Sequence, residues 1–388
     1  MKILFLISTV TNKNKGIGGH YYSLLTIAEA LSEIHDVHIV HIGIISSVAL
    51  SSSNLEVEEI ISPHYNIIDI LSRLNRLVRQ IEPEILHSFD IPSHFFSRII
   101  SLKYRIPNIL TKCGGENPKV YFPYATNLIL FSKENEIYFN SHNKFKHTQI
   151  YLIPNRVKEV RIDEERIKQL KREIDNIATY DSIILRVTRI GNYYRKVNIQ
   201  LVNLLSVLRK RNINCCLVFI GIVENTQIKE SLLHETEHLF IVNEQRLTTN
   251  AKELINLADI VHGTGRSFME ACSLSKMMLA PTANLDYPVL FSKENYVDIL
   301  NQNISGRYIE EKYNNESVVN EIADLLKNED KQQKAKIFSK EIFDKYFSID
   351  SAMNNYTEIY ENVKYIKSIK IFDLFLNYLF IKKIRIRG

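Results

Sequence analysis

The sequence predicts an α/β protein built from two doubly wound parallel sheets, each covered by helices on both faces. Three observations support this fold class. Short apolar runs alternate with amphipathic helical stretches along most of the 388 residues. The alternation breaks once, around Pro154 and Asn155, and then restarts. Most of the twelve glycines lie next to an expected strand end, where doubly wound folds bind their ligands.

The first half of the chain predicts one of the two sheets. Helices are expected between its strands, for example over Tyr21–Ile34 and Ile67–Ile81, because apolar residues there recur at helical spacing. Strands that alternate with such helices form a parallel sheet. The expected strands are Lys2–Ile7, Val37–Ile42, Glu84–His87, Asn108–Thr111, Leu128–Phe131 and Gln149–Ile153.

The second half predicts another sheet of the same kind. A highly charged stretch from Lys158 to Asp175 indicates a linker followed by a surface helix. From Glu316 to Val363 only helical patterns remain. The expected strands between these two regions are Ser182–Val187, Cys215–Ile220, Leu239–Val242, Asp259–Val261 and Met277–Ala280.

The composition excludes several classes of protein. With 45% hydrophobic and 24% charged residues, the chain is typical of a globular protein rather than a disordered one. Its net charge of +5 arises in the tail, because seven of the 49 basic residues and only one of the 44 acidic residues lie from Lys364 onward. A nearly neutral body argues against nucleic-acid binding and for a local basic surface.

The termini and cysteines indicate a cytoplasmic protein. The apolar run Met1–Thr9 is too short for a signal peptide and predicts a first buried strand. No run of about 18 apolar residues predicts a transmembrane helix. The four cysteines lack C-x-x-C spacing and lie in or beside apolar segments, as reduced cysteines do.

The segment Leu257–Pro281 carries the most informative site pattern. Gly263 and Gly265 lie between an expected strand and helix, where glycines let the backbone approach a ligand and the helix start offers N–H groups, including that of Arg266, to an anion. Glu270 follows one to two turns into the helix, within reach of a sugar hydroxyl. The segment therefore predicts a ligand that carries both phosphate and sugar.

Two further groups are candidates for the same ligand. Arg189 and Lys196 flank a polar loop after the strand Ser182–Val187, where two cations suit a diphosphate. Arg195 competes with Lys196 for this role, and ordinary surface charge is the alternative for all of them. His262 is expected on the turn before Gly263, either as a packed structural residue or as a functional one.

Other motifs argue against metal and cofactor chemistry. The loop of Gly16, Gly18 and Gly19 does not match G-x-G-x-x-G, so a nicotinamide enzyme is disfavoured and no cofactor is expected. The loop is either a flexible turn or one whose amides face a ligand. His234 to His238 matches the H-E-x-x-H zinc motif, but an apolar strand follows at once, which favours a solvated helix end. No D-x-D pair occurs, so no metal is expected.

Taken together, these segments resemble glycosyltransferase family 4, the retaining sugar-nucleotide transferases with the GT-B fold. Four segments carry the resemblance in the family's order: IPNRV at Ile153–Val157, RVTRIGNYYRK at Arg186–Lys196, ELINLADIVHGTGRSFMEA at Glu253–Ala271, and KYFSIDSAMNNYTEIYENV at Lys345–Val363. It implies two Rossmann-like domains that face each other across a cleft, over residues 1–157 and 158–347. Helices over residues 348–388 then return to the first domain.

The resemblance also implies an activity and its residues. A hexosyltransferase of this family moves a sugar, without metal, from a UDP- or GDP-sugar to a glycan or lipid-linked acceptor, as in bacterial surface polysaccharide synthesis. Arg189 and Lys196 take the places of the diphosphate-binding cations and count, with His262, as catalytic. Glu270 takes the place of the Glu that binds the ribose. Donor contacts are also expected from Gly18, Gly19, Gly263, Gly265 and Arg266.

Two positions depart from the family pattern. His262 stands for the first Glu of the E-x7-E motif, which contacts the donor sugar. Cys113 stands for the histidine of a T-x-H-G motif. Both changes leave a second function open, that of a non-catalytic nucleotide-sugar-binding partner subunit of a glycosyltransferase complex.

The tail over residues 366–388 mixes aliphatic and aromatic residues with lysines and arginines. Such a segment binds an anionic membrane surface, which would make the protein peripheral on the inner face of the membrane. The alternative is a helix that packs back on the N-terminal domain.

Overall fold

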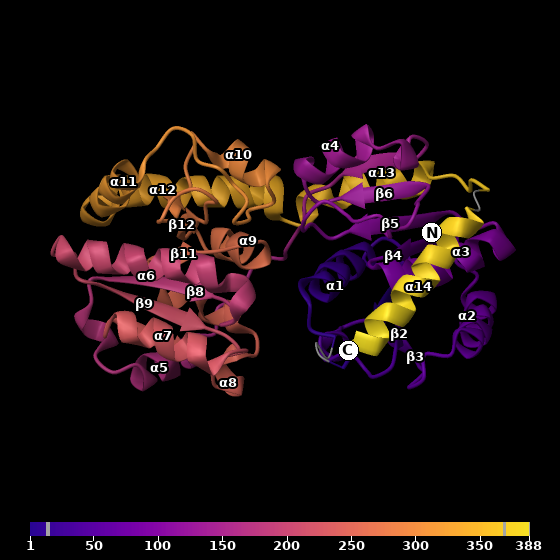
Figure 1. Ribbon diagram of the computed structural model, residues 1–388, viewed down its shortest axis with the longest axis horizontal. Coiled ribbons are helices and arrows are strands. Elements are labelled where there is room, and N and C mark those ends of the chain that lie inside the picture. Colours follow the sequence, from indigo (N-terminus) through magenta and orange to yellow (C-terminus); the bar gives the residue numbers. More distant parts are fainter. Residues whose placement is uncertain (13–15, 368–369, 388) are drawn as a thin grey trace. The chain divides into compact units, whose positions relative to one another are not determined.

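The computed structural model describes residues 1–12, 16–367 and 370–387, so residues 368–369 and 388 of the tail lie outside the described residues. It divides the chain into two compact units (Figure 1). Unit 1 comprises residues 1–156 and 349–388, and unit 2 comprises residues 157–348. The two ends of unit 2 lie side by side, because the N–H of Val157 donates to the carbonyl of Phe347 at 2.8 Å and Val157 forms a β-bridge with Ser348.

Unit 1 contains a seven-stranded, fully parallel sheet in the order β3-β2-β1-β4-β5-β6-β7. The direction of winding reverses between β1 and β4. Strand β3 was not predicted, since its sequence VEEII has exposed acidic residues in place of an apolar run. The strands are β1 (Lys2–Thr9), β2 (Asp36–Gly43), β3 (Val57–Ile61), β4 (Ile85–Ser88), β5 (Asn108–Lys112), β6 (Asn127–Leu130) and β7 (Gln149–Leu152).

Helices of unit 1 bury apolar residues against this sheet in separate clusters. One cluster joins α1 and α13 to the sheet, and another joins α2, α3 and α14 to it. Side-chain caps fix two of the helix starts: Asn66 accepts N–H bonds at the start of α2, and Asp90 does so at the start of α3. The helices are α1 (Gly19–Leu31), α2 (Ile67–Ile81), α3 (Ile91–Tyr104), α4 (Lys133–Ser141), α13 (Met353–Asn362) and α14 (Ile371–Arg387).

Unit 2 contains a six-stranded sheet in the order β10-β9-β8-β11-β12-β13, parallel except for the pairing of β13 with β12. Its winding reverses between β8 and β11. His262 is the last residue of β11, so the expectation that it lies on the following turn was wrong. The strands are β8 (Ser182–Val187), β9 (Cys215–Ile220), β10 (Leu239–Val242), β11 (Ile260–His262), β12 (Met277–Ala280) and β13 (Val289–Leu290).

Helices and strands of unit 2 share one hydrophobic core. The two sheets confirm the predicted α/β class with two doubly wound parallel sheets. The helices are α5 (Glu164–Glu173), α6 (Arg195–Lys210), α7 (Thr226–Glu235), α8 (Gln245–Thr248), α9 (Arg266–Ser273), α10 (Tyr296–Asn301), α11 (Asn315–Lys327) and α12 (Glu329–Ile342).

The zinc motif that the sequence offers can be compared with this fold. The H-E-x-x-H pattern does not lie on one helix, because α7 ends at Glu235 while His238 lies beyond it, with its Nδ1 at 3.0 Å from the hydroxyl of Tyr180. The two histidines therefore lack the common helical face that a zinc peptidase needs. Within residues 1–12, 16–367 and 370–387, no helix is both long and apolar enough to cross a bilayer.

Candidate functional site

The candidate site in unit 2 lies at the carboxyl edge of its sheet, where β8 and β11 are neighbours. Ile184 pairs with Ile260 and Leu185 with Val261, so Arg186 and His262 come next on the two strands. The loop of residues 188–194 leaves β8 here, and the turn of residues 263–265 leaves β11. In doubly wound sheets the point where winding reverses is the usual place for a ligand.

Glycine is required at two positions of the turn before α9. A Cβ at Gly263 would lie 2.5 Å from Cα of Phe268, so the strand exit and the helix can approach only without a side chain. Gly265 has φ +54° and ψ −124°, which an L side chain rarely adopts. Apart from the two chain neighbours of Gly265, no residue that the structure describes has an atom within 4 Å of the Cβ position there. The turn thus leads into α9 with open space beside Gly265.

Glu270 and Arg266 form an ion pair on α9. Their closest N···O distance is 3.5 Å, and the Glu270 side chain is only 13% exposed. Burial raises the pKa of Glu270, and the nearby Arg266 and Lys252 oppose that rise. The carboxylate therefore has a cationic neighbour that helps to keep it ionised, and an ionised carboxylate accepts stronger hydrogen bonds from hydroxyl groups.

Arg189 and Lys196 lie at the same sheet edge and contact different loops. Arg189, with a side chain 39% exposed, lies 3.4 Å from Glu224 after β9. Lys196, in the first turn of α6, donates to the carbonyl of Ala283 after β12 at 2.6 Å. A hollow of about 410 Å³ opens beside Lys196, lined by Asn192, Arg195, Lys196, Ile199, Gln200, Asn203, Leu285 and Asp286.

The structure also shows a buried polar cluster that sequence reasoning missed, formed by Arg186, Asn198 and His262. Nε of Arg186 donates to Oδ1 of Asn198 at 3.0 Å, and Nη1 donates to Nδ1 of His262 at 2.5 Å. All three residues are at most 1% exposed. Burial lowers the pKa of Arg186 to about 10, although Tyr194 acts in the opposite direction. Burial and the charge of Arg186 together hold the pKa of His262 well below its usual value.

A signal for this cluster was present in the sequence. Arg186 is the charged residue within the apolar strand Ser182–Val187, and long cationic side chains are seldom fully buried without a reason. His262 and Glu270 are separated by seven residues, as the two acidic residues of the E-x7-E motif are. His262 nevertheless lies in β11, where its side chain is fully buried against Arg186 and is not exposed in the turn.

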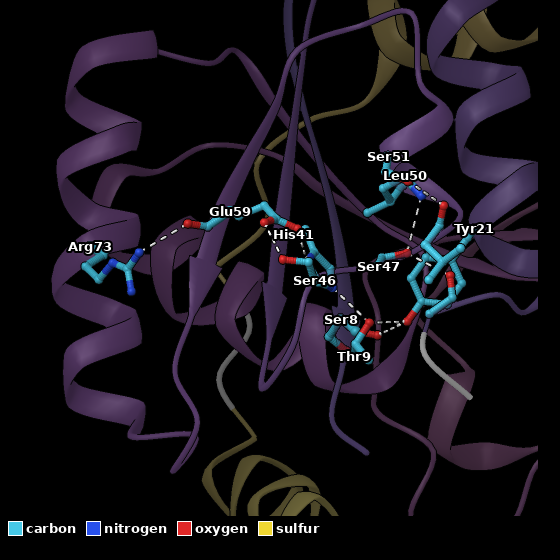
Figure 2. Close-up of polar contacts among 12 residues, drawn as sticks. Ser8, Thr9, Tyr21, His41, Ser46, Ser47, Leu50, Ser51, Glu59 and Arg73 are labelled. Carbon is cyan, nitrogen blue, oxygen red and sulfur yellow. Dashed lines mark hydrogen bonds and ion pairs between the residues drawn. The ribbon is translucent and has the colours of Figure 1, made fainter. Parts of the chain in front are cut away.

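Unit 1 has its own polar network at the carboxyl end of β1 (Figure 2). Oγ1 of Thr9 lies 2.7 Å from the hydroxyl of Tyr21 and 2.8 Å from Nε2 of the buried His41. Next to it, Asp90 accepts hydrogen bonds from the backbone N–H of Ser8 at 2.6 Å and from its hydroxyl at 2.7 Å. These contacts hold the exits of β1 and β4 together at the point where the winding of this sheet reverses.

The glycine loop of unit 1 opens α1 beside this network. Gly16 has φ +65°, and a Cβ there would lie within 2.8 Å of Ser47, whose hydroxyl donates to the carbonyl of Gly16. Gly18 precedes the helix and Gly19 begins it. Among the described residues, apart from its chain neighbours and the backbone of its own helix, no atom lies within 4 Å of the Cβ position of Gly19. Cys113 follows β5 and is partly exposed. Gly16, Gly18, Gly19 and Cys113 therefore belong to unit 1, and the candidates from Arg189 to Glu270 belong to unit 2.

Comparison with solved structures identifies the class of fold. A glycosyltransferase from Rickettsia africae ESF-5 superposes with a TM-score of 0.68 at 14% identity, over 93% of this chain and 97% of that one. HepE from Anabaena, in complex with UDP-glucose, gives 0.67 at 13% identity over 94% and 100%. Sucrose-phosphate synthase from Thermosynechococcus elongatus gives 0.61 at 14% identity over 93% and 98%. The chain thus has the GT-B fold.

The same fold also occurs in a putative UDP-N-acetylglucosamine 2-epimerase from Listeria monocytogenes, with a TM-score of 0.56 at 12% identity over 95% of this chain and 99% of that one. No protein-family model and no curated protein sequence matches the chain. At these low identities the likeness establishes the fold, and the activity has to be argued from the residues.

Proposed function

We propose that this protein is a retaining, metal-independent glycosyltransferase of family 4, which moves a sugar from a UDP- or GDP-sugar to a glycan or lipid-linked acceptor in bacterial surface polysaccharide synthesis. The observation that carries the proposal is the meeting of two loops at the β8–β11 edge of unit 2. One loop brings Arg189 and leads into α6 with Lys196. The other brings Gly263, Gly265 and the start of α9.

The proposed chemistry is stabilisation of the leaving diphosphate. As the bond between the sugar and the phosphate oxygen breaks, negative charge grows on the diphosphate, and preorganised cations and N–H groups stabilise it. Arg189 can be redirected to the diphosphate cheaply, because its present ion pair with Glu224 is exposed and such pairs contribute about 0–1 kcal/mol. Lys196 and the N–H of Arg266 would complete the anion site.

Two further residues would hold the rest of the donor. Glu270 would accept hydrogen bonds from the ribose hydroxyls. The departing phosphate would take the proton of the acceptor hydroxyl, so no protein base is required. His262 suits this scheme as a neutral hydrogen-bonding residue, since its Nδ1 already accepts from Arg186. By the family resemblance, Gly18 and Gly19 would also contact the donor phosphates.

One observation favours a second candidate, the non-catalytic binding subunit. The position that supplies a sugar-contacting carboxylate in the family is a histidine here, His262, and its side chain is fully buried. A protein that binds the nucleotide-sugar without transferring the sugar would tolerate this change. A UDP-sugar epimerase with the same fold is the third outcome to be tested.

The test is to incubate the protein with UDP- and GDP-sugars, with and without membrane lipid extract as acceptor, and to follow nucleotide release and the identity of the sugar. A transferase releases UDP or GDP in proportion to a product with a retained anomeric configuration. Binding without release would establish the partner subunit, and an isomerised sugar-nucleotide would establish the epimerase. Absence of nucleotide binding would refute the proposal.

We also propose that the tail attaches the protein to the anionic inner face of the membrane. Helix α14 packs on α3 through a partly polar face: Asp373 accepts from Arg98 at 2.7 Å, and Asn377 and Ile381 are buried beside it. Its outer face carries the exposed residues Ile371, Phe372, Phe375 and Leu379, followed by the exposed Lys382 and Lys383.

This arrangement suits a lipid surface. Aromatic and aliphatic side chains enter the interface, and each lysine near anionic lipid contributes about 1 kcal/mol. Phe372 and Phe375 are 73% and 53% exposed, so replacing both by serine should abolish flotation with phosphatidylglycerol vesicles and leave the folded protein intact. Ile68→Ser, at a residue 81% exposed on α2, is the matched control. Unchanged flotation of the double variant would refute the attachment.

A further inference from the structure

The cluster of Arg186, Asn198 and His262 leaves three buried nitrogen atoms without a hydrogen-bond partner among the described residues: Nη2 of Arg186, Nδ2 of Asn198 and Nε2 of His262. The guanidinium of Arg186 also has no carboxylate partner in the part of the chain that the structure describes, because its contacts are Asn198, His262 and the ring of Tyr194. A buried cation without a counterion opposes folding and calls for a reason.

All three unpartnered atoms are hydrogen-bond donors. A guanidinium has no acceptor, so Nδ1 of His262 has to accept from Arg186, and the single proton of the neutral ring then lies on Nε2. Oδ1 of Asn198 accepts from Arg186, which identifies the unpartnered amide atom as the NH₂ group. Three donors and one positive charge with no acceptor define a site for an anion with several oxygen atoms.

The cluster lies at the β8–β11 edge, where the candidate site also lies. The ring of Tyr194 lies over the guanidinium, with its centroid 5.9 Å from Cζ of Arg186. Tyr194 belongs to the short 3₁₀ helix Asn192–Tyr194, in the same loop that carries Arg189. The ring that contacts the buried guanidinium therefore comes from the loop expected to hold the diphosphate.

We propose that Arg186, Asn198 and His262 form a buried anion site that takes an oxyanion of the phosphate class once Tyr194 moves aside. The inference rests on the proposed function only for the source of the oxyanion, which would be the distal phosphate of the donor's diphosphate. Free inorganic phosphate or pyrophosphate offers the same chemistry. His262 then acts as a fixed donor to the anion and not as a proton acceptor.

The sharpest test is Asn198→Asp, which places a carboxylate beside Arg186 and so supplies the missing counterion from within the protein. We expect this variant to unfold at the same or a higher temperature than the wild type and to bind pyrophosphate at least tenfold more weakly. Asn320→Asp adds the same charge on the exposed side of α11, where Asn320 accepts from Arg211, and is the control. It should change pyrophosphate affinity by less than threefold.

A second variant guards against unexpected effects of the new carboxylate. Arg186→Met removes the buried charge while keeping a long apolar stem, and it should also lose pyrophosphate binding, with circular dichroism to check that the variant is folded. If both variants bind pyrophosphate within twofold of the wild type, the cluster is structural, its donors are satisfied by internal water, and the proposal is overturned. Lack of pyrophosphate binding by the wild type also overturns it.

Nucleotides separate this inference from the proposed function. If the wild type binds UDP and pyrophosphate but not uridine, and Asn198→Asp weakens the binding of UDP and of pyrophosphate, both proposals are supported. Pyrophosphate binding that Asn198→Asp abolishes, without binding of UDP or GDP, supports the anion site and refutes the transferase. UDP binding that neither variant alters leaves the transferase standing and refutes the anion site.

Discussion

Replacing Gly263 by alanine should disturb the close approach of α9 to the sheet and leave the rest of the fold unchanged. The added Cβ would lie 2.5 Å from Cα and 2.7 Å from N of Phe268. These are backbone atoms, and Phe268 is itself fully buried, with its ring 4.9 Å from that of Phe291 and 6.2 Å from that of Phe347. Neither side can yield without moving α9.

The magnitude follows from the cost of overpacking, which is about 1–3 kcal/mol. This strain can appear as lost stability or as a shift of α9 that weakens nucleotide binding. Since about 1.4 kcal/mol corresponds to a factor of ten in binding, a shift that carried the whole strain would weaken UDP binding roughly 5- to 150-fold. We expect most of the strain to appear as weaker UDP binding, because the turn beside Gly265 is open while Phe268 is packed.

The assay is calorimetric titration with UDP, combined with thermal unfolding followed by circular dichroism. Gly306→Ala is the control, because its Cβ would lie at an acceptable 3.4 Å from Cγ2 of Val197. If Gly263→Ala leaves both the UDP affinity and the unfolding temperature at wild-type values, the reasoning from this close approach is refuted.

Three more predictions concern single side chains. Arg189→Ala should lower kcat/KM about 10- to 150-fold, the loss of one charge-assisted bond, with unchanged unfolding temperature; equal kcat/KM would remove it from the site. Glu270→Ala should weaken UDP binding about tenfold but not pyrophosphate binding, since its expected partner is ribose; titrations with both ligands test this. Asp373→Ala should cost about 3–5 kcal/mol by leaving Arg98 buried without a counterion, which urea unfolding measures. Burial alone would raise the pKa of Asp373, but its bonds to Lys144, the N–H of Tyr124 and Arg98 hold it below 3.8. Asp373 therefore stabilises the fold fully above the pKa that it has in the unfolded chain, and this stabilisation is lost as the pH falls through its lower pKa in the folded protein. Hydrogen exchange in α14 should speed up over that pH range.

Much of the fold could be predicted because its strands are continuous apolar runs. The bounds of β8, β9, β10 and β12 agree with the predicted ranges. Helix α2 also agrees, because Asn66 caps a sequence with clear helical spacing. Acidic residues hid the edge strand β3, and β13 has only two residues, which form no pattern.

The candidate site was less accessible to sequence reasoning. The pattern placed Arg189 and Lys196 after β8, but their contacts, Glu224 and Ala283, lie 35 and 87 residues further along the chain. Pairings over such separations come from the tertiary fold and leave no local pattern. The buried position of His262 likewise depends on its neighbour across the sheet, which a count of residues within one segment cannot show.

The adjacent ends of unit 2 indicate where the chain could be divided into two separately expressed parts. Because Val157 and Phe347 are hydrogen-bonded neighbours, residues 157–348 form an uninterrupted insertion that enters and leaves at one place. We expect that such a piece folds when expressed alone, and that a short linker can rejoin Arg156 to Ile349 in the remainder. Each half would then offer its ligands separately, with nucleotides given to one and acceptors or vesicles to the other.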